Sequence, residues 1–292
     1  MDSKTLLAVL AHPDDESFGP GGTLALYAHS GVDVHIAIAT DGAVGSVVEG
    51  YEEARARLAE VRREELDAAI EILGAQLHML GYRDSGYIGD PANEHPQAFV
   101  NADQDEATCR VVRLIRELRP QVVLTHDEMG GYYHPDHIMA HTVATAAFHA
   151  AGDPQKYPDV GPDPYQPQRL YYTAFPRRYL RFYLLIMRLR GQDPTRMGRN
   201  KDIDFTKLGR PMDDLTARIN IFPYWEVKQQ ASAQHRSQGG GGGGFASWMP
   251  EWMRKRIFNM EYFIRAYPPP EDGVWERDLF AGVDVEAEGE RV

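Results

Sequence analysis

The first half of the chain alternates short apolar runs with amphipathic stretches, and this alternation limits the fold more than any other feature. The apolar runs have the length of buried strands, and the amphipathic stretches have helical spacing. The expected strands are 5–11, 32–40, 76–81 and 121–126, and the expected helices are 22–29, 52–73, 102–118 and 135–151. Such alternation over short connections produces a parallel sheet. We therefore predict an α/β, Rossmann-like fold with a mostly parallel sheet and helices on both faces.

The second half follows a different pattern. Residues 153–168 contain five prolines, which no regular element tolerates, so this segment is expected to be a crossing loop. Beyond it we expect strands at 169–175 and 217–222 and an arginine-rich amphipathic helix at 179–190. The chain then divides into a catalytic core, 1–152, and a C-terminal part, 153–292, that completes the substrate pocket within the same structural unit.

Two features of the second half have more than one interpretation. A basic amphipathic helix can lie on an anionic membrane surface, but the acidic chain favours a helix packed against the protein. The six consecutive glycines at 239–244 predict a flexible loop, which is a candidate lid over a pocket.

Composition excludes several classes of protein. The chain has 31 Lys+Arg against 43 Asp+Glu, a net charge of -12 that argues against a general nucleic-acid binder. Its one cysteine, Cys109, excludes a disulfide framework and a thiolate zinc cluster and fits a reducing compartment. No segment approaches the roughly 20 apolar residues of a membrane-spanning helix, and the first residues do not resemble a secretory leader. We therefore expect a cytoplasmic protein without stable membrane insertion.

A motif rich in histidine and aspartate follows the first expected strand: His12-Pro13-Asp14-Asp15. At the end of a strand, its side chains would reach the crevice where parallel sheets bind ligands. Imidazole and carboxylate groups together suit a divalent ion such as zinc. Two adjacent carboxylates cannot easily bind one ion, which leaves one of them free as a general base. An ordinary polar turn would also explain these residues.

A second cluster, His134-Pro135-Asp136-His137, follows the fourth expected strand. Pro135 suits the first position of a helix. An aspartate near the positive end of a helix would explain this cluster by itself, but not the placement of both clusters at strand ends. A hydrolytic zinc site needs three protein ligands and an open position for water. The two strand ends together supply three such ligands: His12, Asp15 and His137.

These motifs resemble those of the LmbE/PIG-L deacetylases. The matching stretches are AHPDDE at 11–16, TDG at 40–42, DSG at 84–86 and HPDH at 134–137. The resemblance covers residues 5–150 and continues more loosely into the second half. Members of this family are zinc-dependent hydrolases that remove the acyl group from an N-acyl glucosamine or a related amide, and some serve in mycothiol, bacillithiol or glycolipid-anchor synthesis.

The resemblance implies roles for individual residues. His12, Asp15 and His137 would hold Zn²⁺, and Fe²⁺ would fit the same ligands. Asp14 would be the general base that takes a proton from the attacking water. We also expect Glu16 to orient one of the metal ligands without binding the metal itself.

Further roles follow from the same resemblance. His134 would stabilise the oxyanion or protonate the leaving amine, with Asp136 holding it in its charged tautomer, and Tyr132 would help to polarise the amide carbonyl. An exposed helix face would explain the two candidate arginines equally well. The candidate substrate contacts are Arg62 or Arg63, Asp84 and Gln238.

The chain departs from the family pattern in four places. Ala43 and Ser46 stand where thiol-synthesis relatives often carry acidic residues, Tyr133 replaces a small residue, and His126 occupies a position where an aromatic or aliphatic residue is common. These differences leave the metal ligands unchanged but weaken any claim to one particular sugar.

We therefore predict a zinc-dependent hydrolase that removes an acetyl group from an N-acetylglucosamine-type small molecule. The alternatives are an amidase acting on thiol-sugar conjugates or another linear amide, and a sugar-binding relative without turnover. A metal-dependent phosphatase is a third alternative, but it would usually need more carboxylates to hold two metal ions. The motifs supply ligands for one ion only. The expected partner is a small N-acyl amino-sugar, with a second copy of the chain as a candidate and no nucleic acid.

Overall fold

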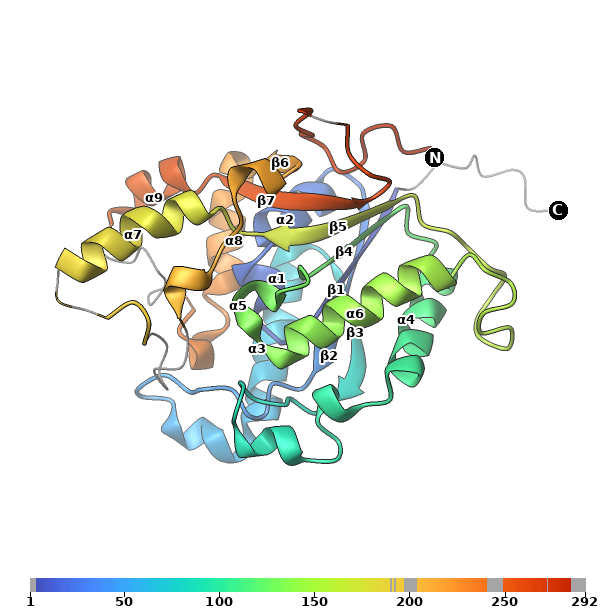
Figure 1. Cartoon of the computed structure of the whole chain (residues 1–292). Helices are drawn as coiled ribbons and strands as arrows, with labels where there is room; N and C mark the ends of the chain where they lie inside the picture. Colours follow the sequence, from blue (N-terminus) through green and yellow to red (C-terminus); the bar gives the residue numbers. More distant parts are fainter. Residues whose placement is uncertain are drawn as a thin grey trace.

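The computed structural model describes residues 4–189, 191, 193–196, 204–240, 249–271 and 273–284 (Figure 1). In this part of the chain seven strands form one sheet in the order β3-β2-β1-β4-β5-β7-β6. The first five are parallel, while β7 runs antiparallel to both β5 and β6. The strands are β1 (Thr5–Leu10), β2 (Asp33–Thr40), β3 (Gln76–Tyr82), β4 (Val122–Thr125), β5 (Arg169–Ala174), β6 (Ala217–Asn220) and β7 (Met260–Tyr267).

Helices connect these strands and cover the sheet. Within the described ranges the α-helices are α1 (Asp15–Phe18), α2 (Gly21–His29), α3 (Leu58–Leu73), α4 (Gln104–Leu118), α5 (Gly130–Tyr133), α6 (Pro135–Ala150), α7 (Arg177–Leu189), α8 (Trp225–Ser232) and α9 (Glu251–Ile257). The 3₁₀ helices are η1 (Glu52–Arg57), η2 (Pro91–Glu94), η3 (Phe99–Asn101), η4 (Phe205–Lys207), η5 (Met212–Asp214), η6 (Phe222–Tyr224) and η7 (Arg236–Gln238). The fold class predicted from the sequence is confirmed.

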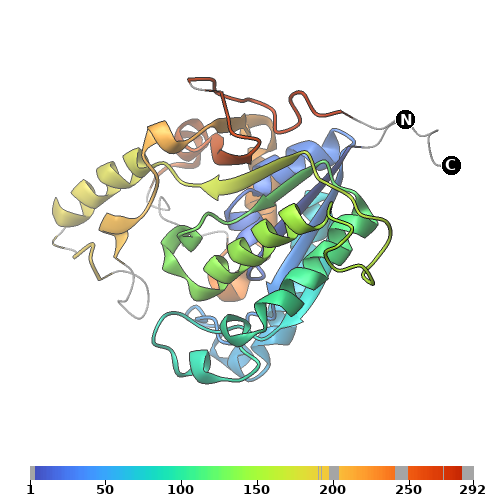
Figure 2. The ribbon, with the colours of Figure 1, turned by 45° about the vertical axis from the view of Figure 1, so that its right-hand side comes forward.

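The alternation of side chains along β1 explains the two layers. Leu6 and Leu10 pack with residues of α2, α3 and α8 on one face, and Leu7 and Val9 pack with residues of α4 and α6 on the other. All four side chains are fully buried because the strand is central and covered on both sides. Figure 2 shows α4 and α6 together on one face of the sheet.

The predicted helix ends agree with the structure, with one correction. Gly74 adopts a left-handed conformation with a φ of 73° after α3, as expected of a C-terminal cap. Pro135 occupies the first turn of α6. The helix predicted over 52–73 is wrong at its start, because residues 52–57 form η1, where no residue is buried against the protein.

The C-terminal part adds three strands to the sheet, and one of them was missed. The segment 153–168 contains no helix or strand, as predicted. The sequence analysis did not find β7, because Glu261 interrupts its apolar character. The buried Glu261 carboxylate accepts hydrogen bonds from the backbone of Gly22 at 3.0 Å and Thr23 at 2.8 Å. The local sequence pattern does not indicate these distant partners. The strand predicted over 217–222 ends early, where η6 begins.

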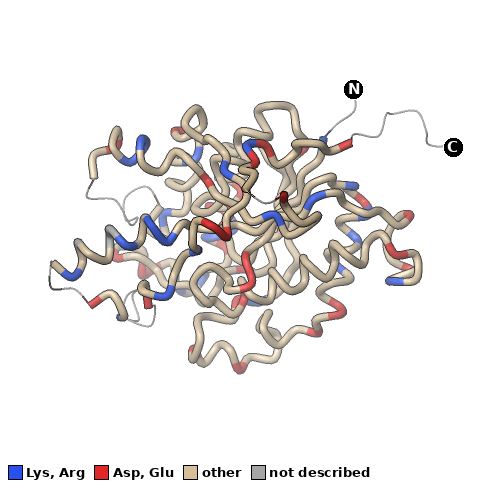
Figure 3. Tube along the Cα trace, turned by 45° about the horizontal axis from the view of Figure 1, so that its top comes forward, with Lys and Arg blue, Asp and Glu red and all other residues tan. Residues whose placement is uncertain are grey.

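The basic helix α7 packs against the protein along one side only. Its arginines are spread along the length of the helix (Figure 3): Arg177, Arg178, Arg181 and Arg188. Leu180 and Met187 are buried, whereas Leu185 and Leu189 are exposed. Of the glycine run, only Gly239 and Gly240 lie within the described residues, so the predicted lid falls outside them. No helix in the described part of the chain has the length and apolar character needed to cross a membrane.

Candidate active site

The turn after β1 directs its polar side chains to the carboxyl edge of the sheet. Asp15 folds this turn, since its Oδ2 accepts hydrogen bonds from the backbone N–H of Ala11 at 3.2 Å and of His12 at 2.8 Å. The second histidine motif approaches from the start of α6, which follows β4 and so begins at the same edge. The two sequence clusters therefore meet in space, as the strand pattern predicted.

The three predicted ligands lie close to one another, and Asp15 approaches the two histidines through different oxygens. His12 Nδ1 is 3.1 Å from His137 Nε2 and 3.7 Å from Asp15 Oδ2, and His137 Nε2 is 3.4 Å from Asp15 Oδ1. Ligands of a tetrahedral zinc, with bonds of about 2.0–2.1 Å, lie about 3.3 Å from one another. Two imidazoles and one carboxylate, all in N/O chemistry, fit a catalytic zinc or a similar divalent ion.

The protonation states of two of these groups also suit ligation, which requires unprotonated donors. Burial favours a protonated Asp15, but the neighbouring His137 and His126 outweigh it and hold the pKa of Asp15 well below its ordinary value. Burial lowers the pKa of His137 well below its ordinary value, although the neighbouring Asp15 opposes this shift.

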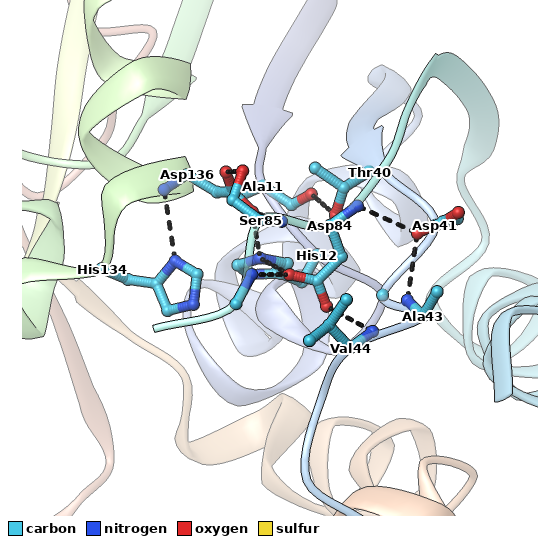
Figure 4. Close-up of polar contacts among 12 residues, drawn as sticks. Ala11, His12, Thr40, Asp41, Ala43, Val44, Asp84, Ser85, His134 and Asp136 are labelled. Atoms are coloured by element: carbon cyan, nitrogen blue, oxygen red, sulfur yellow. Dashed lines mark hydrogen bonds and ion pairs between the residues drawn. The ribbon is translucent and has the colours of Figure 1, made fainter. Parts of the chain in front are cut away.

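His12 has carboxylates behind it. Its Nε2 lies 3.1 Å from Asp136 Oδ2 and 3.6 Å from Asp84 Oδ1 (Figure 4). Burial alone would lower the pKa of His12, but these hydrogen bonds raise it well above its ordinary value. The backbone N–H of Ser85 donates to Asp136 at 2.9 Å, and its hydroxyl donates to the same carboxylate. A carboxylate that orients a histidine whose other nitrogen faces a metal is a common arrangement behind zinc ligands.

The structure does not show the expected contact between the Asp136 carboxylate and His134. Instead the backbone N–H of Asp136 donates to His134 Nδ1 at 3.2 Å (Figure 4), so that nitrogen carries a lone pair and Nε2 holds the proton. Burial, with the neighbouring His12 next, lowers the pKa of His134 to about 3. The ring is therefore neutral here, and the predicted charged tautomer is corrected to a neutral one.

Asp14 lies beside the ligands without belonging to the triad. Its Oδ2 is 3.0 Å from the Arg62 guanidinium, and burial, partly offset by that arginine, raises the pKa of Asp14 to about 6. Arg62 also donates to the carbonyls of Gly42 and Pro13. A Cβ on Gly42 or Gly45 would come within 2.5–2.6 Å of an Arg62 nitrogen, so both glycines leave room for this side chain.

The structure separates the two candidate arginines. Arg62 is 3% exposed and lines the cavity beside Asp14. Arg63 lies on the solvent side of α3, where its Nε donates to Asp67 at 2.9 Å. The exposed-face interpretation thus describes Arg63 alone.

A cavity of about 220 Å³ opens above the cluster. Asp84 reaches it, but the Asp84 carboxylate also accepts backbone hydrogen bonds from Val44 at 3.1 Å (Figure 4) and from Gly86 at 2.8 Å. Tyr132 reaches it from α5 and Gln238 from η7. Burial raises the pKa of Tyr132 well above its ordinary value. The predicted site residues on its wall are His12, Asp14, Arg62, Asp84, Tyr132, His134 and Gln238.

His126 joins the cluster in a way that the sequence analysis did not anticipate. Its Nε2 lies 3.4 Å from Asp15 Oδ2 and accepts the backbone N–H of Ala11 at 3.2 Å. Its ring stacks on His137 with centroids 4.0 Å apart. Asp15, His126 and His137 form one of three overlapping candidate metal groups among the described residues. Its position directly after β4 was the available signal, since His12 follows β1 in the same manner.

Comparison with known proteins finds relatives over most of the chain. A protein-family profile described as "PIG-L: GlcNAc-PI de-N-acetylase" matches residues 7–148. A 1D-myo-inositol 2-acetamido-2-deoxy-alpha-D-glucopyranoside deacetylase from Geodermatophilus obscurus is 38% identical over 293 residues, covering 96% of this chain and 98% of that protein. A mycothiol S-conjugate amidase from Streptomyces coelicolor is 36% identical over 292 residues, covering 97% of this chain and 98% of the relative.

A solved structure shares the fold. The N,N'-diacetylchitobiose deacetylase from Pyrococcus horikoshii superposes with a TM-score of 0.60 at 21% identity, covering 90% of this chain and 84% of that one. At that identity the likeness concerns the fold alone. The identity to the Geodermatophilus obscurus protein extends over nearly the whole of both chains. The chain belongs to the PIG-L family.

Proposed function

We propose that the chain is a metal-dependent N-deacetylase that hydrolyses the acetamide of an N-acetylated amino sugar. The observation that carries this proposal is the cluster of His12, Asp15 and His137 beside a carboxylate outside it, Asp14, on the cavity wall. The curated relatives of similar length support the class of substrate.

The triad would hold Zn²⁺, and Fe²⁺ suits the same nitrogen and oxygen donors. When bound, such an ion supplies Lewis acidity to the amide carbonyl and makes water more acidic. The contacts of His12 Nε2 with Asp136 and Asp84 leave Nδ1 as the nitrogen that would bind the ion.

Asp14 has the position of a general base. It takes a proton from water as the water oxygen bonds to the carbonyl carbon. It then returns this proton to the nitrogen as the carbon–nitrogen bond breaks, so the products are acetic acid and the free amine, and the acid ionises to acetate once released. Arg62 fixes the carboxylate for both transfers through the 3.0 Å ion pair.

His134 and Tyr132 are placed as neutral donors. With Nδ1 accepting the Asp136 N–H, the remaining proton of His134 is on Nε2, where it can donate to the developing oxyanion. Tyr132 lines the same cavity, its ring centroid 5.7 Å from that of His134, with its hydroxyl proton retained. Because His134 is neutral, we assign protonation of the leaving amine to Asp14.

A second candidate is hydrolysis of the amide in a thiol-sugar conjugate. The Streptomyces coelicolor relative with this name is nearly as similar to the chain as the deacetylases. Both reactions use the same ligands, base and donors and differ only in the acyl group.

The test compares the wild type with Asp14→Ala. We would measure bound metal and amine release from the acetylated glucosaminyl inositol, from N-acetylglucosamine and from a mycothiol S-conjugate. We expect about one divalent ion per chain in both proteins and a loss of about 10²–10⁴-fold in kcat for the variant. A wild type without divalent metal, or a fully active variant, would contradict the mechanism. Faster release from the conjugate would select the second candidate.

A further inference from the structure

A buried polar contact joins α1 to the segment after α8. His235 Nε2 lies 2.6 Å from Glu16 Oε1, and both side chains are 0% exposed. A buried carboxylate is costly unless partners compensate it, so this contact stabilises Glu16 in its buried position. The proposed reaction uses neither residue.

The other oxygen of Glu16 holds the main chain of Asp14. Glu16 Oε2 accepts the Asp14 backbone N–H at 2.9 Å, and the Ser17 hydroxyl donates to Oε1 at 2.6 Å. Asp14 has a φ of 139° and a ψ of -25°. Such a conformation is strained for a residue other than glycine by about 1–3 kcal/mol, and it persists only where surrounding contacts impose it.

We propose that Glu16 and His235 are a positioning pair for Asp14. His235 fixes the Glu16 side chain, and Glu16 holds the strained Asp14 main chain so that the carboxylate faces Arg62 and the cavity. The sequence analysis expected Glu16 to orient a metal ligand, but its contact is with the candidate base. The inference rests on the proposed function, because it assigns Asp14 that role.

The contacts of His235 indicate which replacement should preserve the pair. Its Nδ1 is buried without a hydrogen-bond partner among the described residues, so Nε2 makes the polar contact of the ring. A glutamine amide can place a donor near the same point, whereas phenylalanine keeps the shape of the ring without any donor. The two replacements therefore separate the hydrogen bond from the packing.

A control is available in the same interface. Ser232, at the end of α8, donates to the backbone carbonyl of Ser17 at 3.3 Å. This bond joins α1 to α8, next to the segment that carries His235, but it involves neither Glu16 nor Asp14. Ser232→Ala therefore weakens the interface without releasing the base.

The experiment measures kcat, KM, bound metal and Tm for the full chain with the acetylated substrate. We expect His235→Phe to lower kcat by about 10²-fold, the cost of misplacing a catalytic group by about 1 Å, with KM and metal content unchanged. His235→Gln should recover most of this loss. Ser232→Ala should lower Tm while retaining kcat.

Three results would overturn the inference: a His235→Phe variant with wild-type kcat, a Gln variant no better than Phe, or an equal loss of kcat in Ser232→Ala. If His235→Phe does not fold, Glu16→Asp replaces it, because the shorter carboxylate keeps its charge but cannot span both partners. Its kcat should fall in the same way, and an unchanged kcat would be contradictory. A wild type that releases no amine would refute the proposed function itself, whereas an active wild type with an unaffected variant would refute only the pair.

Discussion

Arg62 and Arg63 are neighbours in the chain with opposite environments. Arg62 is buried against Asp14 and two backbone carbonyls, and Arg63 is exposed beside Asp67. We expect Arg62→Ala to lower kcat/KM by about 10²-fold, because Asp14 loses the contact that orients it. Loss of one partner from a buried pair should also reduce the free energy of unfolding by about 3–5 kcal/mol.

Arg63→Ala is the matched control, since an exposed ion pair contributes little. Its free energy of unfolding in urea should stay within about 0.5 kcal/mol of the wild type, and its kinetic constants should not change. Equal effects of the two substitutions would contradict the assignment of Arg62.

At the residue scale, the sequence predicted which groups meet but not how they bond. His12, Asp15 and His137 were found because strand ends share one edge of the sheet. The neutral state of His134 could not be predicted, because it depends on burial and on the neighbouring His12, and the position of its proton depends on a single backbone N–H at the start of α6. The contact of His235 with Glu16 could not be predicted either, since it spans 219 positions and follows from packing alone.

At the scale of elements, β2 and β3 are joined by a pair of histidines as well as by the ladder. His35 Nδ1 lies 3.0 Å from His78 Nε2. Burial, and then His35, lowers the pKa of His78 below its ordinary value of 6.5, although Glu117 and Asp33 oppose this shift. The folded chain therefore binds a proton at His78 less readily than the unfolded chain does.

This shift has a definite sign for stability. Above about pH 6.5 His78 is neutral in both the folded and the unfolded state and does not change the free energy of unfolding. Below that pH the unfolded state binds a proton at His78 more readily than the folded state, which lowers the free energy of unfolding. We expect the wild type to lose more stability than His78→Gln between about pH 7 and pH 5.5. Urea unfolding of both proteins at the two values checks this. An equal loss in both would mean that His78 titrates alike in the two states.

Helix α2 packs closely on the chain after β6. A Cβ on Gly22 would lie 2.7 Å from Cβ and Cδ1 of Ile221. Helix propensity alone favours alanine over glycine by about 1 kcal/mol, but overpacking costs about 1–3 kcal/mol. We expect Gly22→Ala to lower the free energy of unfolding in urea.

The partner of this contact provides the control. Ile221→Ala leaves a cavity and should itself destabilise the chain by about 2–5 kcal/mol. The double variant should lose less free energy of unfolding than the two single variants lose together, because the new methyl group occupies part of the cavity. A Gly22→Ala variant more stable than the wild type would show that helix propensity outweighs the close packing.

The elements of the first half were predictable because the apolar residues of each one recur at a single spacing, either that of a strand or that of a helix. Strand β7 was not, since Glu261 stands at a buried position and is compensated there by backbone N–H groups of α2 and by Lys228 at 2.6 Å. Those partners lie far away in the chain. Local periodicity therefore fails where a buried charge is satisfied by tertiary contacts.

At the scale of the whole molecule, one sheet runs through both halves of the chain. β4 of the first half pairs with β5 of the second, in register from Val122 opposite Arg169 to Thr125 opposite Tyr172. A further link joins α2 to the C-terminal region, where the Tyr27 hydroxyl donates to Asp278 at 2.8 Å. A division at residue 152 would cut through this sheet.

We therefore expect the full chain to unfold in one cooperative transition. Every tryptophan lies after residue 152, so tryptophan fluorescence follows the C-terminal part: Trp225, Trp248, Trp252 and Trp275. Hydrogen exchange in β1 and β2 follows the first half. In a urea titration the two signals should change with coincident midpoints, as two-state unfolding requires. A fluorescence transition at lower urea, with β1 still protected, would mean that the first half folds by itself and that the C-terminal strands merely dock on its edge.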